Sequence, residues 1–246
     1  MRRRDFLAAA CSCAICAAGS ASALAGIPKD LVEPHMHFVP SGAAPEVAMT
    51  LDACMGETDM RILSALLVHK IAVTIFATQR WLDSNPQTIR LLKQHPELFA
   101  IQNHGARHIP AIIGTEKAYG IAPAGTADAV TAEVLNGAAA VAAAFGVNPG
   151  WYRDATALYS RDAMSLIGRL GFSIGGFSLN GDIGASVSTA VAHSRIAAAK
   201  SGDVIISHIN QPHRPAGAGV AAGLIALKAR GFKFVHLDDV TMAAVA

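Results

Sequence analysis

Short β-rich runs alternate with longer helical patterns along most of this chain, and this alternation limits the possible folds more than any other feature. It is typical of parallel α/β proteins, in which each strand is followed by a covering helix. The expected strands are residues 47–51, 72–77, 99–103, 150–153, 173–177, 204–207 and 233–237. The expected helices are residues 87–94, 126–145, 160–170 and 219–229. The Pro/Gly-rich stretches are short enough to be loops, so we expect one barrel-like domain.

The chain is apolar enough to raise the question of a membrane protein, because its 246 residues are 52% hydrophobic with a mean hydropathy of +0.37. The one long uncharged stretch, residues 6–28, directly follows Arg2-Arg3-Arg4-Asp5. Adjacent arginines before a moderately apolar, Ala-rich segment are typical of a twin-arginine export signal. Ala23-Leu24-Ala25 provides the small residues that a signal peptidase needs.

We therefore expect a signal peptide at 1–25 and a mature domain at 26–246, with the export machinery as a partner. The mature chain is expected to be periplasmic or secreted, without stable insertion in a membrane. An uncleaved N-terminal anchor is the alternative, because the stretch is long enough to cross a bilayer.

The net charge and the positions of the cysteines exclude further classes of protein. The formal net charge is only +2, which gives no basic surface for nucleic acid, so no nucleic-acid partner is expected. Three of the four cysteines, Cys11, Cys13 and Cys16, lie in the expected signal. Cys54 is then alone in the mature chain and cannot form an intramolecular disulfide.

Polar residues of several kinds follow the expected strands. In parallel barrels the chemistry gathers at the carboxyl ends of the strands, so these side chains are expected to converge on one rim. Carboxylates, imidazoles and a guanidinium together supply the ligands, base, acid and orienting groups of metal-assisted hydrolysis. The residues at these positions are Asp52, His104, His108, Arg153, Asp182 and His208.

These residues resemble, in order, the motifs of the polysaccharide deacetylases with the NodB homology domain, carbohydrate esterase family four. The resemblance extends from about residue 47 to residue 240. Its most specific part is Asn103-His104 through His108, which matches the family pattern Asn-His-(three residues)-His. The other matching segments are Thr50-Leu51-Asp52, Thr78-Gln79-Arg80-Trp81, Tyr152-Arg153, Asp182 and Ile206-Ser207-His208.

The resemblance implies a distorted parallel (β/α) barrel of about seven strands and a divalent metal, usually zinc. His104 and His108 would be metal ligands. Asp52 would be the general base that takes a proton from the attacking water, and Arg153 would hold that base in place.

The resemblance also implies how the reaction ends. His208 would be the general acid, and Asp182 would orient it or tune its charge. Ile206 would contribute to an apolar pocket for the acetyl methyl group. The expected reaction is removal of acetyl groups, N-acetyl before O-acetyl, from a carbohydrate polymer or oligosaccharide.

The chain departs from the family pattern at the metal. The second aspartate of the first motif, a metal ligand in the family, is Ala53 here. Catalytic zinc needs three protein ligands, so another group must replace it. The alternatives are Asp52 itself, Glu57 or Asp59 in the next turn, or a distal carboxylate. Asp59 is the preferred substitute, because Gly56 would let the loop bend.

Two further functions stay open at this stage. Ala53 is compatible with a degenerate member of the same fold that binds glycan without turnover. Cys54 could instead be the nucleophile of an amidase, or the barrel could cleave a small non-sugar C–N amide. A nucleophilic thiol needs a basic neighbour, and without one Cys54 is a buried small residue.

Overall fold

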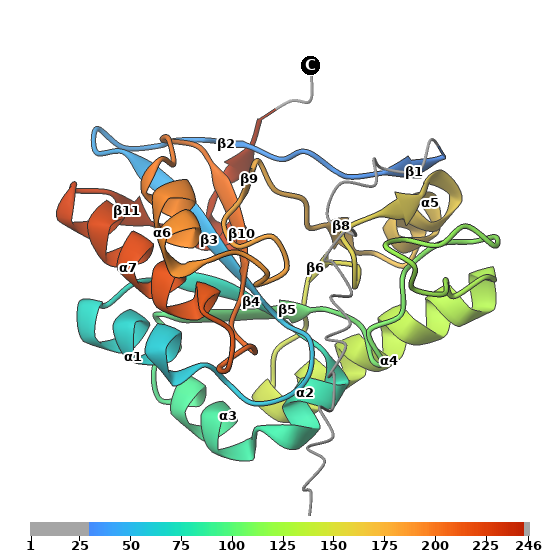
Figure 1. The fold of residues 1–246 in the computed structure, drawn as a ribbon. Coiled ribbons are helices and arrows are strands. Elements are labelled where there is room, and N and C mark those ends of the chain that lie inside the picture. Colours follow the sequence, from blue (N-terminus) through green and yellow to red (C-terminus); the bar gives the residue numbers. More distant parts are fainter. Residues whose placement is uncertain (1–29, 244–246) are drawn as a thin grey trace, which may run out of the picture.

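The computed structural model describes residues 30–243, which form one domain built around a curved parallel sheet (Figure 1). The expected signal, residues 1–25, lies outside the described residues. The sheet path has seven strands in the order β8-β6-β5-β4-β3-β10-β9, and β11 pairs with β3 beside this path. This confirms the predicted distorted parallel (β/α) barrel. The strands are β3 (Glu46–Ala53), β4 (Val73–Ala77), β5 (Phe99–Asn103), β6 (Trp151–Tyr152), β8 (Ser173–Ile174), β9 (Leu179–Asn180), β10 (Val204–His208) and β11 (Lys233–Phe234).

Strand β3 is the centre of the sheet, and all of its residues are buried. It pairs in parallel with β10 on one side and β4 on the other, so that Asp52 lies level with His208 and with Phe76. Burial on both faces explains why apolar residues occur on both sides of the strand, with Val47 and Met49 in one hydrophobic cluster and Ala48 in another. The register therefore places the last residues of β3 and β10 side by side.

Helices cover the outside of the sheet. They are α1 (Met60–His69), α2 (Gln79–Ser84), α3 (Pro86–Lys93), α4 (Ala127–Phe145), α5 (Arg161–Arg169), α6 (Thr189–Ala197) and α7 (Ala216–Ala229). Helices α6 and α7 pack against each other, α1 packs on α7, and α4 lies along β5 (Figure 1). The main hydrophobic core fills the space between these helices and the central strands.

Helix α4 is the one helix within residues 30–243 that is long and apolar enough to cross a membrane by length and composition. One of its faces is packed in the domain, where Val130, Val134 and Val141 are buried. Glu133 on the same face accepts hydrogen bonds from the backbone N–H groups of Arg107 and Ile109. Helix α4 therefore has the contacts of a helix that packs on the sheet of this domain.

The sequence predictions place β4, β5, α3 and α4 to within a residue of their observed bounds. Strands β6, β8 and β11 are shorter than predicted, because only two residues of each pair with a neighbouring strand. Helices α1, α2 and α6 and the strand β9 were not predicted. Helix α7 begins three residues before its predicted start.

The segment from residue 31 to residue 39 was not predicted to contain strands, and it runs along one side of the barrel (Figure 1). Its first strand, β1 (Leu31–Val32), pairs with β7 (Tyr159–Ser160), and its second, β2 (Phe38–Val39), pairs with β12 (Thr241–Met242). Between them, isolated bridges join this segment to Phe177 and Asp203. The 3-10 helix η2 (Leu237–Asp239) precedes β12.

Candidate active site

The polar residues predicted to meet at the strand ends do meet. Asp52 is the second-to-last residue of β3, His104 follows β5, Arg153 follows β6, and His208 ends β10. Parallel strands bring these ends to one edge of the sheet. Asp182 follows β9, and His108 lies in the loop after His104. Asp52, His104, Arg153 and Asp182 are buried, whereas His108 and His208 are partly exposed.

Arg153 holds Asp52 in an ion pair inside the barrel. Its Nη1 donates to Asp52 Oδ1 at 2.9 Å and to Thr50 Oγ1 at 2.7 Å. Its Nε and Nη2 donate to the carbonyl oxygens of Gly175 and Gly176, at 3.0 and 2.9 Å. Each of these guanidinium nitrogens thus has a partner, as a fully buried charge requires.

Charges around Asp52 determine its protonation state. Burial alone would raise the pKa of this carboxyl, but the nearby charges of Arg153, His104 and His208 hold it below its ordinary value. Asp52 is therefore ionised at neutral pH. An ionised carboxylate at the floor of a cleft can act as a proton acceptor.

Asp182 and His208 form the second charged pair. Asp182 Oδ1 lies 3.0 Å from His208 Nδ1, and its Oδ2 accepts the backbone N–H of His208 at 2.7 Å. Burial lowers the pKa of His208, but the Asp182 carboxylate and Cys54 together outweigh it and raise that pKa well above its ordinary value. His208 is thus protonated at neutral pH and can donate a proton.

Three potential metal ligands converge beside these pairs. One atom each from Cys54, His104 and His108 lies within 4.8 Å of the other two. His104 Nδ1 faces the carbonyl oxygen of Arg153 at 2.8 Å, so Nδ1 carries a proton. Nε2 is then the nitrogen that would coordinate a metal, with release of its own proton. His108 Nε2 is buried and has no hydrogen-bond partner. Two imidazole lone pairs and a sulfur are donors that zinc accepts, so the residues fit a divalent metal.

The electrostatics at this group also favour a cation. Burial lowers the pKa of His104, but Asp52 and Cys54 raise it to about 9. Burial likewise raises the pKa of the Cys54 thiol, and the imidazoles of His104, His108 and His208 bring it well below its ordinary value. Negative charge is therefore stabilised on the sulfur, next to imidazoles that can coordinate a metal.

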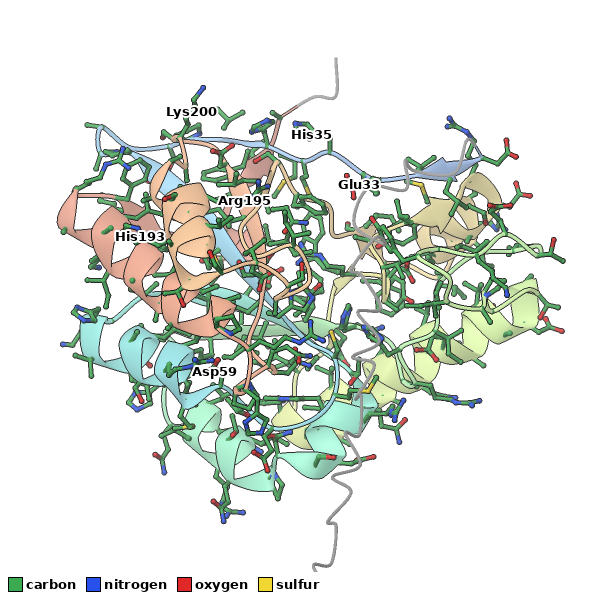
Figure 2. The ribbon with its side chains drawn as sticks, viewed as in Figure 1. Glu33, His35, Asp59, His193, Arg195 and Lys200 are labelled. Atoms are coloured by element: carbon green, nitrogen blue, oxygen red, sulfur yellow. The ribbon has the colours of Figure 1, made fainter. Side chains whose placement is uncertain are left out.

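The structure places Asp59 elsewhere, which corrects its assignment as the third ligand. Asp59 is the N-cap of α1, and its carboxylate accepts the Arg61 backbone N–H at 3.0 Å and Arg61 Nε at 2.9 Å. Figure 2 labels it beside that helix, away from Glu33 and His35 on the N-terminal segment. Both oxygens of the carboxylate already have partners on Arg61. Glu57, the other nearby candidate, is exposed.

A cleft of about 510 Å³ opens over the two charged pairs, with Asp52 and His208 among its lining residues. Its walls are mostly apolar. Ile206 lies in the wall, as expected for the acetyl pocket, and Ile183 also lines it. Tyr119, from the long loop before α4, adds an aromatic ring to the opening.

Sequence reasoning missed two components of this site. Gly175 and Gly176 hold Arg153 through their carbonyls, and a Cβ at Gly176 would lie 2.2 Å from the Pro34 carbonyl oxygen. No sequence pattern marks such backbone partners. Cys54 was considered only as a nucleophile or a packing residue. Its position two residues after Asp52 was a usable signal, because alternate residues of a strand point to the same face.

A parallel barrel with a His/His/Cys group and two carboxylate-paired cations at the strand ends has the parts of a metal-assisted hydrolase. The comparisons identify the family. The polysaccharide deacetylase model matches residues 41–175. The chain belongs to the polysaccharide deacetylase family. A comparison with curated protein sequences found no match.

Solved structures share the fold at low sequence identity. PdaA, a family 4 carbohydrate esterase of Bacillus subtilis, has a TM-score of 0.65 at 19% identity, over 84% of this chain and 83% of its own. A family 4 carbohydrate esterase from Streptomyces lividans, in complex with acetate, has a TM-score of 0.64 at 19% identity. The match covers 83% of this chain and 100% of that one. BA3943, a family 4 pseudoenzyme from Bacillus anthracis, has a TM-score of 0.65 at 15% identity. The match covers 81% of this chain and 66% of that one.

Proposed function

We propose that this chain is a metal-dependent hydrolase that removes acetyl groups, chiefly N-acetyl, from a carbohydrate polymer or oligosaccharide. The observation that carries the proposal is that an ionised Asp52 and a protonated His208 line one cleft, beside three side chains that could hold a metal ion. Their pKa values are shifted in opposite directions, which supports Asp52 as the base and His208 as the acid. The relationship to glycan deacetylases supports the substrate class.

In the proposed reaction, Asp52 accepts a proton from the attacking water, and the water oxygen bonds to the acetyl carbonyl carbon. His208 then donates a proton to the departing amine nitrogen, so the products are acetate and the free amino sugar. Arg153 holds Asp52, and Asp182 keeps His208 protonated and oriented. His104 and His108 would hold the metal, for which zinc is proposed. When bound, it would polarise the carbonyl and favour deprotonation of water.

The test is acetate release from a panel of acetylated glycans and chitooligosaccharides, with and without a chelator. The proposal predicts release that the chelator abolishes and added zinc restores. Binding of glycans without acetate release, under any metal condition, would instead favour the non-catalytic alternative.

A thiol-dependent amidase is the second candidate, and a specific observation favours it. His208, oriented by Asp182, is among the imidazoles that lower the pKa of the Cys54 thiol, so a Cys-His-Asp combination is present. Such an enzyme would form a thioester on Cys54 and would not need a metal. Mass spectrometry of the intact protein after mixing with substrate distinguishes the two, because only the thiol mechanism adds an acyl group to Cys54.

We also propose export through the twin-arginine route, with activity in the periplasm or outside the cell. The Arg2-Arg3-Arg4 sequence and the Ala-rich stretch that follows support it. Cell fractionation should find the mature chain outside the cytoplasm, beginning at Gly26. Changing Arg3 and Arg4 to lysine should retain the full-length chain in the cytoplasm.

A further inference from the structure

The end of strand β3 directs its side chains in alternation. Asp52 faces the catalytic cleft, and Ala53 belongs to the same buried hydrophobic cluster as Ile62 and Trp81, between the sheet and the helices. Cys54, one residue further, returns to the side of Asp52 and approaches His104. The position facing the two histidines is therefore residue 54, whereas residue 53 is part of the core.

The backbone around Cys54 is fixed, so its sulfur has a defined place. Thr78 N donates to the Ala53 carbonyl at 3.2 Å, and Thr78 Oγ1 donates to the Cys54 carbonyl. Ile209 N donates to the Asp52 carbonyl at 3.0 Å. Preorganised ligands of this kind bind metal without the cost of ordering a loop.

The separation between sulfur and nitrogen matches a shared metal. Cys54 Sγ lies 3.5 Å from His104 Nε2. Bonds of about 2.3 Å to sulfur and about 2.05 Å to nitrogen, at a tetrahedral angle, place the two donors about 3.5 Å apart. The unpartnered Nε2 of His108 completes a set of three donors.

Charge considerations agree with this geometry. The Asp52 carboxylate is paired with Arg153. With Cys54 as the metal ligand, Asp52 is not needed for coordination and can act as the base. A thiolate at Cys54 would supply the one negative charge that the missing aspartate would have contributed. A Cys/His/His set leaves a fourth position open, as catalytic zinc sites do.

We propose that Cys54 Sγ is the third protein ligand of a zinc centre completed by His104 and His108. This rests on the proposed function insofar as it assumes a resident metal. It makes the centre a thiolate site, and it gives Cys54 a coordinating role in place of a nucleophilic one.

The test is cobalt titration of the full chain after chelation, followed by absorption spectroscopy. A thiolate ligand gives a sulfur-to-Co²⁺ charge-transfer band in the near ultraviolet, and a tetrahedral site gives intense visible bands. Both are expected at one equivalent. The triple variant C11A/C13A/C16A should keep the charge-transfer band, because those cysteines lie outside the proposed centre.

Variants of Cys54 test the assignment. C54A should lose the charge-transfer band and weaken zinc binding by more than the about 10–100-fold that loss of an outer-shell partner costs. C54D should lose the band but keep one equivalent of zinc, because a carboxylate can replace the thiolate. D59N is the matched control and should keep both the band and the zinc, with folding followed by circular dichroism.

The outcomes separate this inference from the proposed function. Cobalt binding without the charge-transfer band, together with chelator-sensitive acetate release, would overturn the Cys54 assignment and leave the deacetylase standing. A thioester on Cys54 would also overturn it. A charge-transfer band lost in C54A, without acetate release from any glycan, would support the ligand and contradict the enzyme.

Discussion

Asp182 binds His208 at two points, with Oδ1 3.0 Å from the ring Nδ1 and Oδ2 2.7 Å from the backbone nitrogen of the same residue. One carboxylate therefore fixes both the ring and the strand end that carries it. The ring's Nε2 remains for the substrate. This double contact leads to the first prediction.

Asp182→Asn should lower the pKa of His208, because it removes the charge that opposes burial. A raised pKa keeps His208 protonated into alkaline pH, so the variant should lose activity at a lower pH than the wild type. Near neutral pH, kcat should fall by at least about tenfold, and by no more than the about 10²–10⁴ that general acid catalysis contributes. The pH–rate profile measures both effects.

The matched control is Asp203→Asn, which removes a carboxylate that faces the exposed His37. Its profile should overlay that of the wild type. An unchanged alkaline limb in Asp182→Asn would contradict the role assigned to Asp182.

Arg153→Met should destabilise the fold strongly, because it leaves the buried Asp52 carboxylate without its cation. Breaking a buried pair from one side costs about 3–5 kcal/mol. Asp52 has a lowered pKa, so its stabilising contribution is present above the unfolded pKa of about 3.9 and is lost as pH falls through the folded value.

Denaturant unfolding at several pH values tests this second prediction. The difference between wild type and Arg153→Met should be largest near neutral pH and should shrink in acid. Arg153→Lys should recover little, because one ammonium cannot reach the Gly175 and Gly176 carbonyls and Asp52 at once. Equal stability of wild type and Arg153→Met would show that the pair contributes nothing.

Asp52→Asn should remove turnover and keep the metal. The amide retains the shape of the side chain but cannot accept the proton, so kcat should fall by about 10²–10⁴. Zinc content per chain, measured by elemental analysis, should be unchanged. Loss of zinc in this variant would mean that Asp52 itself coordinates the metal.

Most residues of the candidate active site could be predicted from the sequence because they occupy strand ends. Asp52, His104, Arg153 and His208 each end or follow a strand, and parallel strands bring such residues together regardless of their separation in the chain. The third metal ligand was harder to predict. Asp59 is close to Asp52 in sequence, but the helix that begins at Met60 takes its carboxylate as a cap.

The shorter elements were missed for a related reason. Strand β9 has two residues and no alternating pattern, so only its pairing in the folded sheet defines it. Helix α6 carries a weakly segregated apolar face and is held by its contact with α7. Pairing and packing between distant segments decide such elements, and a local pattern does not record them.

Gly137→Ala in helix α4 should destabilise the site as well as the fold. An added Cβ would lie 2.3 Å from Asn103 Oδ1 and 2.5 Å from the Gly105 backbone carbon, on either side of His104. Overpacking of this kind costs about 1–3 kcal/mol. Because the displaced turn carries His104, zinc affinity should fall together with the melting temperature.

Gly168→Ala is its control, since a Cβ at this position in α5 meets nothing within 4 Å. It should raise stability by about 0.5–1 kcal/mol and leave zinc affinity unchanged. A Gly137→Ala variant that melts and binds zinc like the wild type would show that α4 can move away without disturbing the histidine.

The pairing of β1 with β7 sets a limit on how the chain can be matured. Leu31 is buried and in register with Ser160, and Glu33 two residues later lines the cleft. A peptidase that cut beyond residue 30 would remove a strand of the finished domain and part of its substrate opening. A cut that preserves the folded domain must therefore lie before Leu31. The expected cleavage after Ala25 meets this condition.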